Sequence, residues 1–283
     1  MTGTGSGRIA ARFAELRDEG RAALIPFIEA FDPDEATSAA ILRGLPGAGA
    51  DLIEIGVPFT DPAADGPTIQ RAGQRALKAG GTLAGTLATV RAFRDADDAT
   101  PIVLMGYLNP ILAYGPERFC RDAKGAGVDG VIVVDMPPEE SDELLPHTIS
   151  AGLDMIRLVA PTTDDARLPR VLGEASGFVY YVAIAGITGT RSAAGEELAR
   201  AIPRVRARTA LPVAIGFGVR TPEQAAQAAR VADAVVVGSA LLETLAATLD
   251  EAGRAGPDTV RRVLDHVRGL AAATREARVG VAA

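Results

Sequence analysis

A short apolar run, a stiff loop and the start of a helix follow one another in DLIEIGVPFTDPAADGPTIQRA, residues 51–72. The run over 51–57 is rich in leucine and isoleucine, which is typical of a parallel strand covered on both faces. Pro67 suits the first turn of a helix, and the residues after it repeat apolar side chains at helical spacing. The stretch therefore predicts one β-α unit, with a carboxylate, Glu54, inside its strand.

Seven further apolar runs are spaced along the chain, with amphipathic segments between them. They occupy residues 23–28, 101–107, 130–136, 154–160, 178–184, 211–218 and 234–240. Eight β-α units of similar length predict an α/β fold, a (β/α)8 TIM barrel in a single domain. An open doubly wound sheet is the alternative, and the glycine-rich loops after the last two strands favour the barrel.

The barrel is expected to use nearly the whole chain. We expect residues 8–18 to form an extra N-terminal helix that precedes the first strand. Residues 8–275 are then the barrel domain, residues 1–7 a glycine-rich disordered tail, and residues 276–283 a C-terminal tail.

The composition excludes several classes of function. The 283 residues carry a formal net charge of −7, which argues against nucleic acid and anionic membranes as partners. No apolar run reaches the roughly 20 residues of a membrane span. The one cysteine, Cys120, has no partner for an internal disulfide, so we expect a reducing, cytoplasmic location. Two histidines and no cysteine cluster make a metal site improbable.

Alternation along the strand at 51–57 decides where Glu54 points. Leu52, Glu54 and Gly56 share one face, and Ile53 and Ile55 share the other. The β-branched face suits contact with the outer helices, so Glu54 is predicted to point into the barrel. Loss of water there raises the pKa of a carboxyl toward the range useful for proton transfer at neutral pH. The alternative is a structural glutamate held by backbone donors.

Two more acids, Asp61 and Asp65, lie in the loop after this strand, which two prolines and a glycine make stiff. The active sites of barrels lie at the C-terminal ends of their strands, so this loop can aim a carboxylate at the site. Asp65 also suits the N-cap of the next helix, because it precedes Gly66 and Pro67. Both interpretations stay open for Asp65, whereas Asp61 suits a turn better than a site.

Glycines end the last two strands, in IGFGV (215–219) and VVGSA (236–240). Gly216, Gly218 and Gly238 allow a backbone to approach a ligand closely, and Ser239 adds a hydroxyl at the start of the following helix. We therefore predict a phosphate site there, with ordinary turns as the alternative. The glycine-rich segment 185–195 is predicted to be either a lid or a plain surface loop.

Aromatic residues are few, and four of them fall near predicted strand ends: Phe27, Tyr107, Tyr180 and Phe217. Together they indicate a pocket for a flat apolar ligand, and simple filling of the core is the alternative.

These residues together resemble the tryptophan synthase alpha subunit family, over about residues 8–275. The most specific segment is LIEIGVPFTDPAADGPTIQRA, and supporting segments are LMGYLNPI (104–111), VDGVIVVDMPPEES (128–141), YYVAIAGITGTR (180–191), IGFGVRTPEQ (215–224) and VVVGSAL (235–241). The resemblance implies a single (β/α)8 barrel that performs a retro-aldol cleavage of indole-3-glycerol phosphate. The products are indole and glyceraldehyde 3-phosphate, for tryptophan biosynthesis, and no metal or organic cofactor is required.

The resemblance also implies roles for individual residues. Glu54 matches the general acid and base, and Asp65 matches a second catalytic acid that pairs with the indole N–H. The positions matched to substrate binding are Phe27, Tyr107, Tyr180, Thr188, Gly189, Phe217, Gly218, Gly238 and Ser239. Among these, Thr188 belongs to a loop that closes toward Asp65, and the glycines and Ser239 bind phosphate. Asp61 matches a loop acid associated with the partner, the tryptophan synthase beta subunit, in an α2β2 assembly.

The chain departs from the family pattern at the ends of two strands. Glu29 and Phe31 stand where the family has threonine and glycine, and Ala183 and Ala185 stand where it favours hydroxyl side chains. An extra carboxylate at Glu29 would raise proton affinity near Glu54 and repel a phosphorylated ligand. Phe31 at a glycine position would strain the turn. We hypothesise reduced activity or a changed substrate, tested by Glu29→Thr and Phe31→Gly reversions.

Two alternatives to an ordinary alpha subunit stay open at this point. One is a site-altered homologue that mainly binds ligand and activates the beta subunit. The other is a stand-alone lyase that releases indole. Assay with and without a beta subunit separates these alternatives.

Overall fold

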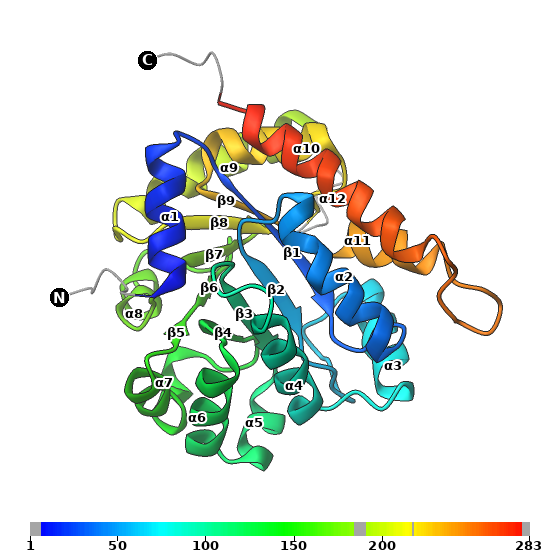
Figure 1. Ribbon diagram of the computed structural model, residues 1–283. Coiled ribbons are helices and arrows are strands. Elements are labelled where there is room, and N and C mark those ends of the chain that lie inside the picture. Colours follow the sequence, from blue (N-terminus) through cyan, green and yellow to red (C-terminus); the bar gives the residue numbers. More distant parts are fainter. Residues whose placement is uncertain (1–6, 184–190, 217, 279–283) are drawn as a thin grey trace.

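A ring of parallel strands with helices around it makes up the molecule (Figure 1). The computed structural model describes residues 7–183, 191–216 and 218–278. Residues 1–6 and 279–283, which belong to the predicted tails, lie outside this range. The strands are β1 (Ala23–Glu29), β2 (Ile53–Gly56), β3 (Ile102–Gly106), β4 (Gly130–Val133), β5 (Asp154–Met155), β6 (Arg157–Val159), β7 (Val179–Val182), β8 (Val213–Gly216) and β9 (Ala234–Val237).

The strands close into a barrel, as predicted. Their order is β5-β4-β3-β2-β1-β9-β8-β7-β6, and every pair is parallel. The two ends of this order, β5 and β6, are separated by Ile156 alone, whose N–H donates to the Val131 carbonyl at 3.0 Å. The fifth predicted strand is thus divided in two because it pairs with β4 before Ile156 and with β7 after it.

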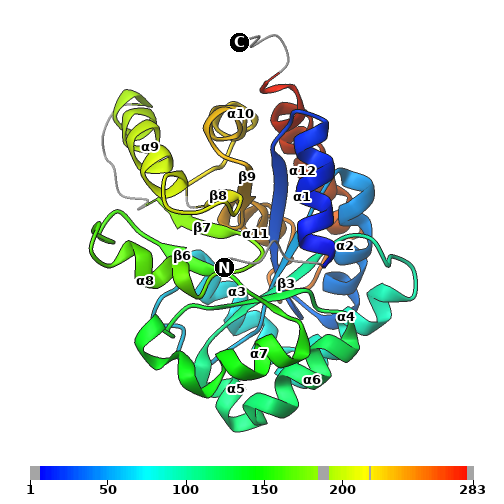
Figure 2. The ribbon, with the colours of Figure 1, turned by 90° about the vertical axis from the view of Figure 1, so that its left-hand side faces the viewer.

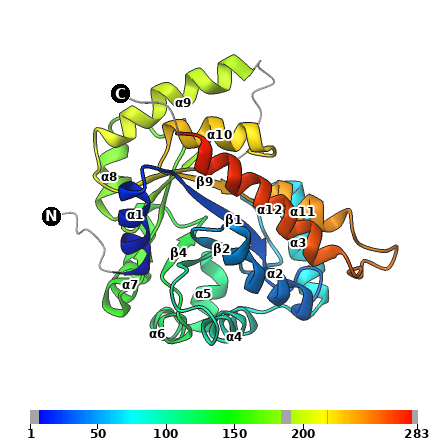
Figure 3. The same cartoon turned by 45° about the horizontal axis from the view of Figure 1, so that its top comes forward.

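Helices lie on all sides of the strands in Figure 2. They are α1 (Arg8–Asp18), α2 (Glu35–Ala48), α3 (Pro67–Lys78), α4 (Leu83–Arg94), α5 (Leu108–Tyr114), α6 (Pro116–Ala126), the 3-10 helix η1 (Pro138–Glu143), α7 (Leu145–Ala151), α8 (Leu168–Gly173), α9 (Arg191–Arg206), α10 (Pro222–Val231), α11 (Ser239–Ala246) and α12 (Thr259–Glu276). The last helix, α12, packs against α10, α11 and α2 and joins the end of the chain to its beginning (Figure 3). Within the described ranges, no helix has the length and apolarity to cross a membrane.

The two faces of the strands belong to different apolar clusters. The interior cluster contains Leu52, Val103 and Tyr180, whereas Ile53 and Ile55 pack with the outer helices. This confirms the alternation predicted for residues 51–57. Because side chains alternate along a strand, Glu54 shares the inward face with Leu52.

The predicted N-terminal helix is present as α1, and it covers the amino-terminal end of the barrel. Its apolar residues Ile9, Phe13 and Leu16 are buried in the interior cluster. Its arginines bind two buried aspartates: Arg12 pairs with Asp51 and Arg8 pairs with Asp129. The helix is therefore the floor of the barrel, and the opposite end is left for the site.

Candidate active site

Glu54 is a buried acid near the carboxyl end of β2. It lies opposite Phe27 of β1 and Val103 of β3 in the sheet register, and only 1% of it is exposed. Its Oε2 atom has no hydrogen-bond partner among the described residues. Burial, reinforced by the negative charge of Asp65, raises the Glu54 pKa from 4.5 to about 8. Glu54 therefore carries a proton at neutral pH, which suits a general acid.

Asp65 lies in the loop between β2 and α3 and is not the N-cap of that helix. The N-cap is Gly66, and no side chain caps it. The Tyr107 hydroxyl instead hydrogen-bonds the Asp65 carboxyl and accepts the Ala64 N–H at 3.0 Å. Burial raises the pKa of Asp65, and the hydrogen bond from Tyr107 partly offsets this by favouring the anion. The capping interpretation of Asp65 is wrong, and the carboxylate is free to face a ligand.

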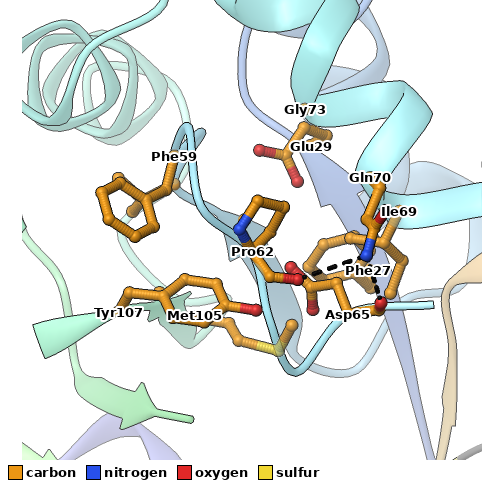
Figure 4. A pocket seen from close by; sticks show the side chains of 13 residues that line it. Phe27, Glu29, Phe59, Pro62, Asp65, Ile69, Gln70, Gly73, Met105 and Tyr107 are labelled. Atoms are coloured by element: carbon orange, nitrogen blue, oxygen red, sulfur yellow. Dashed lines mark hydrogen bonds between the residues drawn. The ribbon is translucent and has the colours of Figure 1, made fainter. Parts of the chain in front are cut away.

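A pocket at the carboxyl ends of β1, β2 and β3 contains Asp65 (Figure 4). The pocket is small and partly open to solvent. The residues that line it are Phe27, Glu29, Gly56, Val57, Phe59, Pro62, Asp65, Ile69, Gln70, Gly73, Met105, Gly106 and Tyr107. Three predicted site residues, Phe27, Asp65 and Tyr107, thus meet in one pocket, and Glu54 lies behind its wall, directly opposite Phe27 in the register.

Side chains from α3 hold the pocket loop in place. Gln70 donates through Nε2 to the backbone carbonyl of Asp65 at 2.9 Å and to that of Pro62 at 3.4 Å (Figure 4). These bonds fix the loop at two points on either side of Ala64. The position of the Asp65 carboxylate is therefore set by the helix that follows it as well as by Tyr107.

Tyr180 lies on β7 inside the barrel and is close to Glu54. The hydroxyl of Tyr180 rests against Gly216 of β8, where a Cβ would come within 2.0 Å of it. Burial and the nearby Glu54 raise the pKa of this phenol, so it stays a neutral hydroxyl. Gly216 is thus needed to accommodate Tyr180, whereas the sequence had suggested a role for this glycine in ligand approach.

Gly238 and Ser239, two of the predicted phosphate residues, lie outside the lining of the pocket. Gly238 is the N-cap of α11, and Ser239 is the first residue of that helix. A Cβ at Gly238 would be 3.2 Å from the Phe27 ring, so this glycine also makes room for Phe27. Gly218 has φ +85°, a conformation that favours glycine.

Some predictions fall outside the residues that the structure describes. Thr188, Gly189, Phe217 and Ala185 belong to this group, as does most of the proposed lid at 185–195. Among the described residues, no group of three His, Cys, Asp or Glu side chains is arranged to hold a metal ion.

Sequence reasoning missed several side chains of the pocket, among them Phe59 and Met105. The Phe59 ring lies 5.3 Å from the Tyr107 ring, centroid to centroid, and Met105 lies on β3. Met105 could have been found, because it has the same strand parity as Val103 in the interior cluster. Phe59 follows a proline in a loop, where no periodicity indicates its direction.

The three described departures from the family pattern, Glu29, Phe31 and Ala183, have different surroundings. Glu29 lines the pocket, as expected from its parity with Phe27. Phe31 has φ 67°, so the predicted strain is present, yet its side chain is buried, with its Cβ beside Gly81 of the α3–α4 turn and its ring against Gly85 of α4. A Cβ at Gly85 would come within 2.7 Å of this ring. Phe31 therefore fills a space that neighbouring glycines provide.

Ala183 corrects one expectation. It follows β7 and packs against the apolar cluster that contains Val179 and Tyr181, on the helix side of the strand. Its side chain therefore faces away from Tyr180 and the barrel interior, and the loss of a hydroxyl there does not alter the pocket. The mistake came from placing Ala183 by its distance along the chain instead of by strand parity.

Comparisons with known proteins decide the family. The model of the family "Tryptophan synthase alpha chain" matches residues 13–274. The chain belongs to the tryptophan synthase alpha chain family. It is 67% identical over 271 residues to the tryptophan synthase alpha chain of Acidiphilium cryptum, with 96% of this chain and 98% of that protein covered. It is 65% identical over 271 residues to that of Gluconacetobacter diazotrophicus, with 96% and 99% covered.

Solved structures of tryptophan synthase agree with this assignment. The alpha subunit from Legionella pneumophila superposes with a TM-score of 0.87 at 37% identity, over 95% of this chain and 99% of that one. A chain of Mycobacterium tuberculosis tryptophan synthase gives 0.84 at 39% identity, over 95% and 98%. The predicted barrel and the predicted lyase activity, cleavage of indole-3-glycerol phosphate in tryptophan biosynthesis, are thereby confirmed. A role limited to binding and activation is not favoured.

Proposed function

We propose that Glu54 is the general acid and base of the tryptophan synthase alpha reaction in this chain, and that Asp65 is the anion that faces the indole N–H. One observation carries the proposal: Glu54 is fully buried, its Oε2 has no partner in the described part of the chain, and its pKa is about 8. Asp65 lies in the adjoining pocket and is close enough to raise that pKa.

The order of proton transfers follows from these protonation states. Protonated Glu54 delivers its proton to C3 of the indole ring, which turns the ring into a good leaving group. The carboxylate left on Glu54 then takes the proton of the glycerol hydroxyl. The carbon–carbon bond breaks, the hydroxyl carbon becomes an aldehyde, and the bonding electrons return to the indole ring. Glu54 ends protonated, and such positioned proton transfer accelerates reactions roughly 10²–10⁴-fold.

Asp65 acts by charge rather than by proton transfer. Protonation at C3 leaves positive character on the indole nitrogen, and a carboxylate fixed beside it stabilises that cation. The Tyr107 hydroxyl favours the ionised form of Asp65. An opposite charge held in a dry site is worth a few kcal/mol of transition-state stabilisation. Phe27, Phe59 and Tyr107 supply the apolar walls for the flat ring.

The phosphate of the substrate is assigned to the other side of Phe27. Gly238 and Ser239 form the start of α11, where free backbone N–H groups and the helix dipole favour an anion, and Gly218 follows β8. Tyr180 borders the interior between the two ends of the substrate. Thr188, Gly189 and Phe217, which lie outside the described residues, complete this assignment from the family resemblance.

A partner and a location complete the proposal. Alpha chains of this family normally pair with a beta subunit, and we propose an α2β2 assembly for this chain. The exposed Asp61, in the loop that carries Asp65, is the proposed contact residue. Co-purification with a beta subunit tests the assembly, since a stand-alone lyase would not form a stable complex. A cytoplasmic location is proposed on the basis of the biosynthetic role.

Release of indole from indole-3-glycerol phosphate tests the proposed roles. We expect Glu54→Gln to lower kcat by roughly 10²–10⁴-fold and Asp65→Asn to lower it by roughly 10²-fold or more. Glu251→Gln is the matched control, because Glu251 is an exposed acid of the α11–α12 loop. Turnover by Glu54→Gln at the wild-type rate, with and without the beta subunit, would reject the assignment.

A further inference from the structure

Glu29 is a carboxyl that the proposed mechanism does not use, although it lies in the substrate pocket. It ends β1 and pairs with Gly56 of β2 in the sheet register. A Cβ on Gly56 would lie 2.2 Å from Oε2 of Glu29 and 2.6 Å from the Phe27 ring. The Glu29 carboxyl thus lies directly over Gly56, in space that only a glycine leaves open.

Glu29 and Asp65 are parts of one pocket wall (Figure 4). In this view Pro62 lies between the two carboxyl groups. The other side of Glu29 meets an apolar surface formed by Ile28 and Leu242. Only 5% of Glu29 is exposed, so it has lost most of its hydration.

The nearest cation does not neutralise Glu29. Arg75 of α3 donates through Nε and Nη2 to the two carboxylate oxygens of Asp32, at 2.6 and 2.8 Å. Within the described ranges, the Asp32 N–H donates to the backbone carbonyl of Glu29, and no group donates a hydrogen bond to the Glu29 carboxyl. A buried carboxylate without a donor or a committed cation is costly, so the neutral acid is the favoured form.

The charges that face Glu29 come from three elements. Asp65 belongs to the β2–α3 loop, Asp32 to the turn after β1, and Arg75 to α3. Burial raises the pKa of Glu29 well above its ordinary value, Asp65 and Asp32 raise it further, and Arg75 opposes them. These surroundings favour the neutral acid, so Glu29 loses its proton at a higher pH than an ordinary glutamate.

We propose that Glu29 is a specificity-determining residue of the pocket, whose carboxyl must carry a proton when the phosphorylated indole substrate binds. The inference rests on the proposed function, because it takes the pocket beside Asp65 as the indole site. Asp65 already supplies the one anion that the indole N–H needs. A second anion on the same wall would repel a ligand whose phosphate carries close to two negative charges above neutral pH.

Binding of an inert ligand tests this without turnover. The probe is the phosphate ester of indole-3-propanol, which has no glycerol hydroxyl for Glu54 to deprotonate. Both proteins compared carry Glu54→Gln, because Glu54 itself titrates near 8 and would mask Glu29. The first keeps Glu29, and the second adds Glu29→Gln, which preserves the shape of the wall but cannot ionise.

Calorimetry compares the affinity for this ligand at about pH 7 and about pH 9.5. The second ionisation of the phosphate is nearly complete at about pH 7, so the charge of the ligand changes little between the two measurements. We expect the affinity of the protein with Glu29 to fall about 10-fold over this interval, as a new charge appears in a buried site. The protein with Glu29→Gln should change by less than about 2-fold. The ¹³C shift of the Glu29 carboxyl, followed over the same interval, should titrate in the first protein.

Other outcomes would overturn the inference. Equal losses of affinity in both proteins would show that another group titrates, and no loss in either would show that Glu29 does not limit binding. Absence of binding to either protein at pH 7 would remove the inference and the proposed substrate site together. Loss of turnover in Glu54→Gln tests the proposed function separately.

Discussion

The two ends of the barrel treat buried acids in opposite ways. At the amino-terminal end, Asp51 and Asp129 are almost fully buried, and each is held by two arginines. At the carboxyl end, Glu54 and Glu29 are buried as deeply, yet neither has an ionic partner of its own. The difference teaches that partners, not burial, decide whether an acid stabilises the fold or stays available for chemistry.

The bonds of Asp51 illustrate the stabilising arrangement. Arg21 donates to both of its oxygens at 2.9 and 3.0 Å, Arg12 donates from α1, and the Leu24 N–H donates at 2.9 Å. These donors replace the water that burial removes. The same carboxylate also ties α1 and the start of β1 to β2, so its bonds join three elements.

Removing the negative charge of Asp51, at the amino-terminal end of the barrel, should give the largest change in stability. Asp51→Asn leaves Arg12 and Arg21 without their buried anion, and we expect the free energy of unfolding to fall by about 3–5 kcal/mol. Urea unfolding at neutral pH measures this. A loss below about 1 kcal/mol would mean that α1 is held mainly by its apolar residues.

At Glu54, in the barrel interior, the same substitution of an acid by its amide should raise the free energy of unfolding instead of lowering it. Glu54 is ionised in the unfolded chain above pH 4.5 but protonated in the folded chain up to about 8. The folded chain thus binds one more proton in this window, so its stability falls as pH rises. Glu54→Gln removes this loss and should raise the free energy of unfolding by roughly 3 kcal/mol at pH 7, since each pKa unit is worth about 1.4 kcal/mol.

Unfolding curves at several pH values check this prediction. The difference between Glu54→Gln and the unsubstituted chain should vanish near pH 4.5 and grow up to about pH 8. Glu251→Gln, at an exposed position, should show no such trend. A stability gain that does not depend on pH would mean that Glu54 is already ionised in the folded chain.

A smaller effect, on catalysis, is expected from removing the Tyr107 hydroxyl that hydrogen-bonds Asp65 in the pocket. Tyr107→Phe removes the hydroxyl that hydrogen-bonds Asp65 and accepts from Ala64. We expect kcat/KM to fall about 10-fold, as one hydrogen bond to a charged group is lost. Because that bond lowers the pKa of Asp65, the acidic limb of the pH–rate profile should move to higher pH. If the acidic limb does not move, Tyr107 does not influence the ionisation of Asp65.

Local patterns predicted much of this molecule because neighbouring residues decide them. The start of α3 at Pro67 and the inward direction of Glu54 both follow from residues a few positions apart. The role of Asp65 was ambiguous in sequence, because the same residue suits an N-cap and a pocket. Tyr107, 42 positions further along the chain, decides between them.

The sequence by itself determined a barrel of eight β-α units, its N-terminal helix, its family and the burial of Glu54, because strand periodicity and motif spacing are local properties. Only the tertiary structure decided that Asp51 forms ion pairs with two arginines while Glu29 forms none. It also decided that neighbouring glycines leave the space that the side chains of Phe31 and Tyr180 fill. Such outcomes depend on side chains that come together from distant strands. A carboxyl's charge depends on those neighbours, so it could not be read from the chain alone.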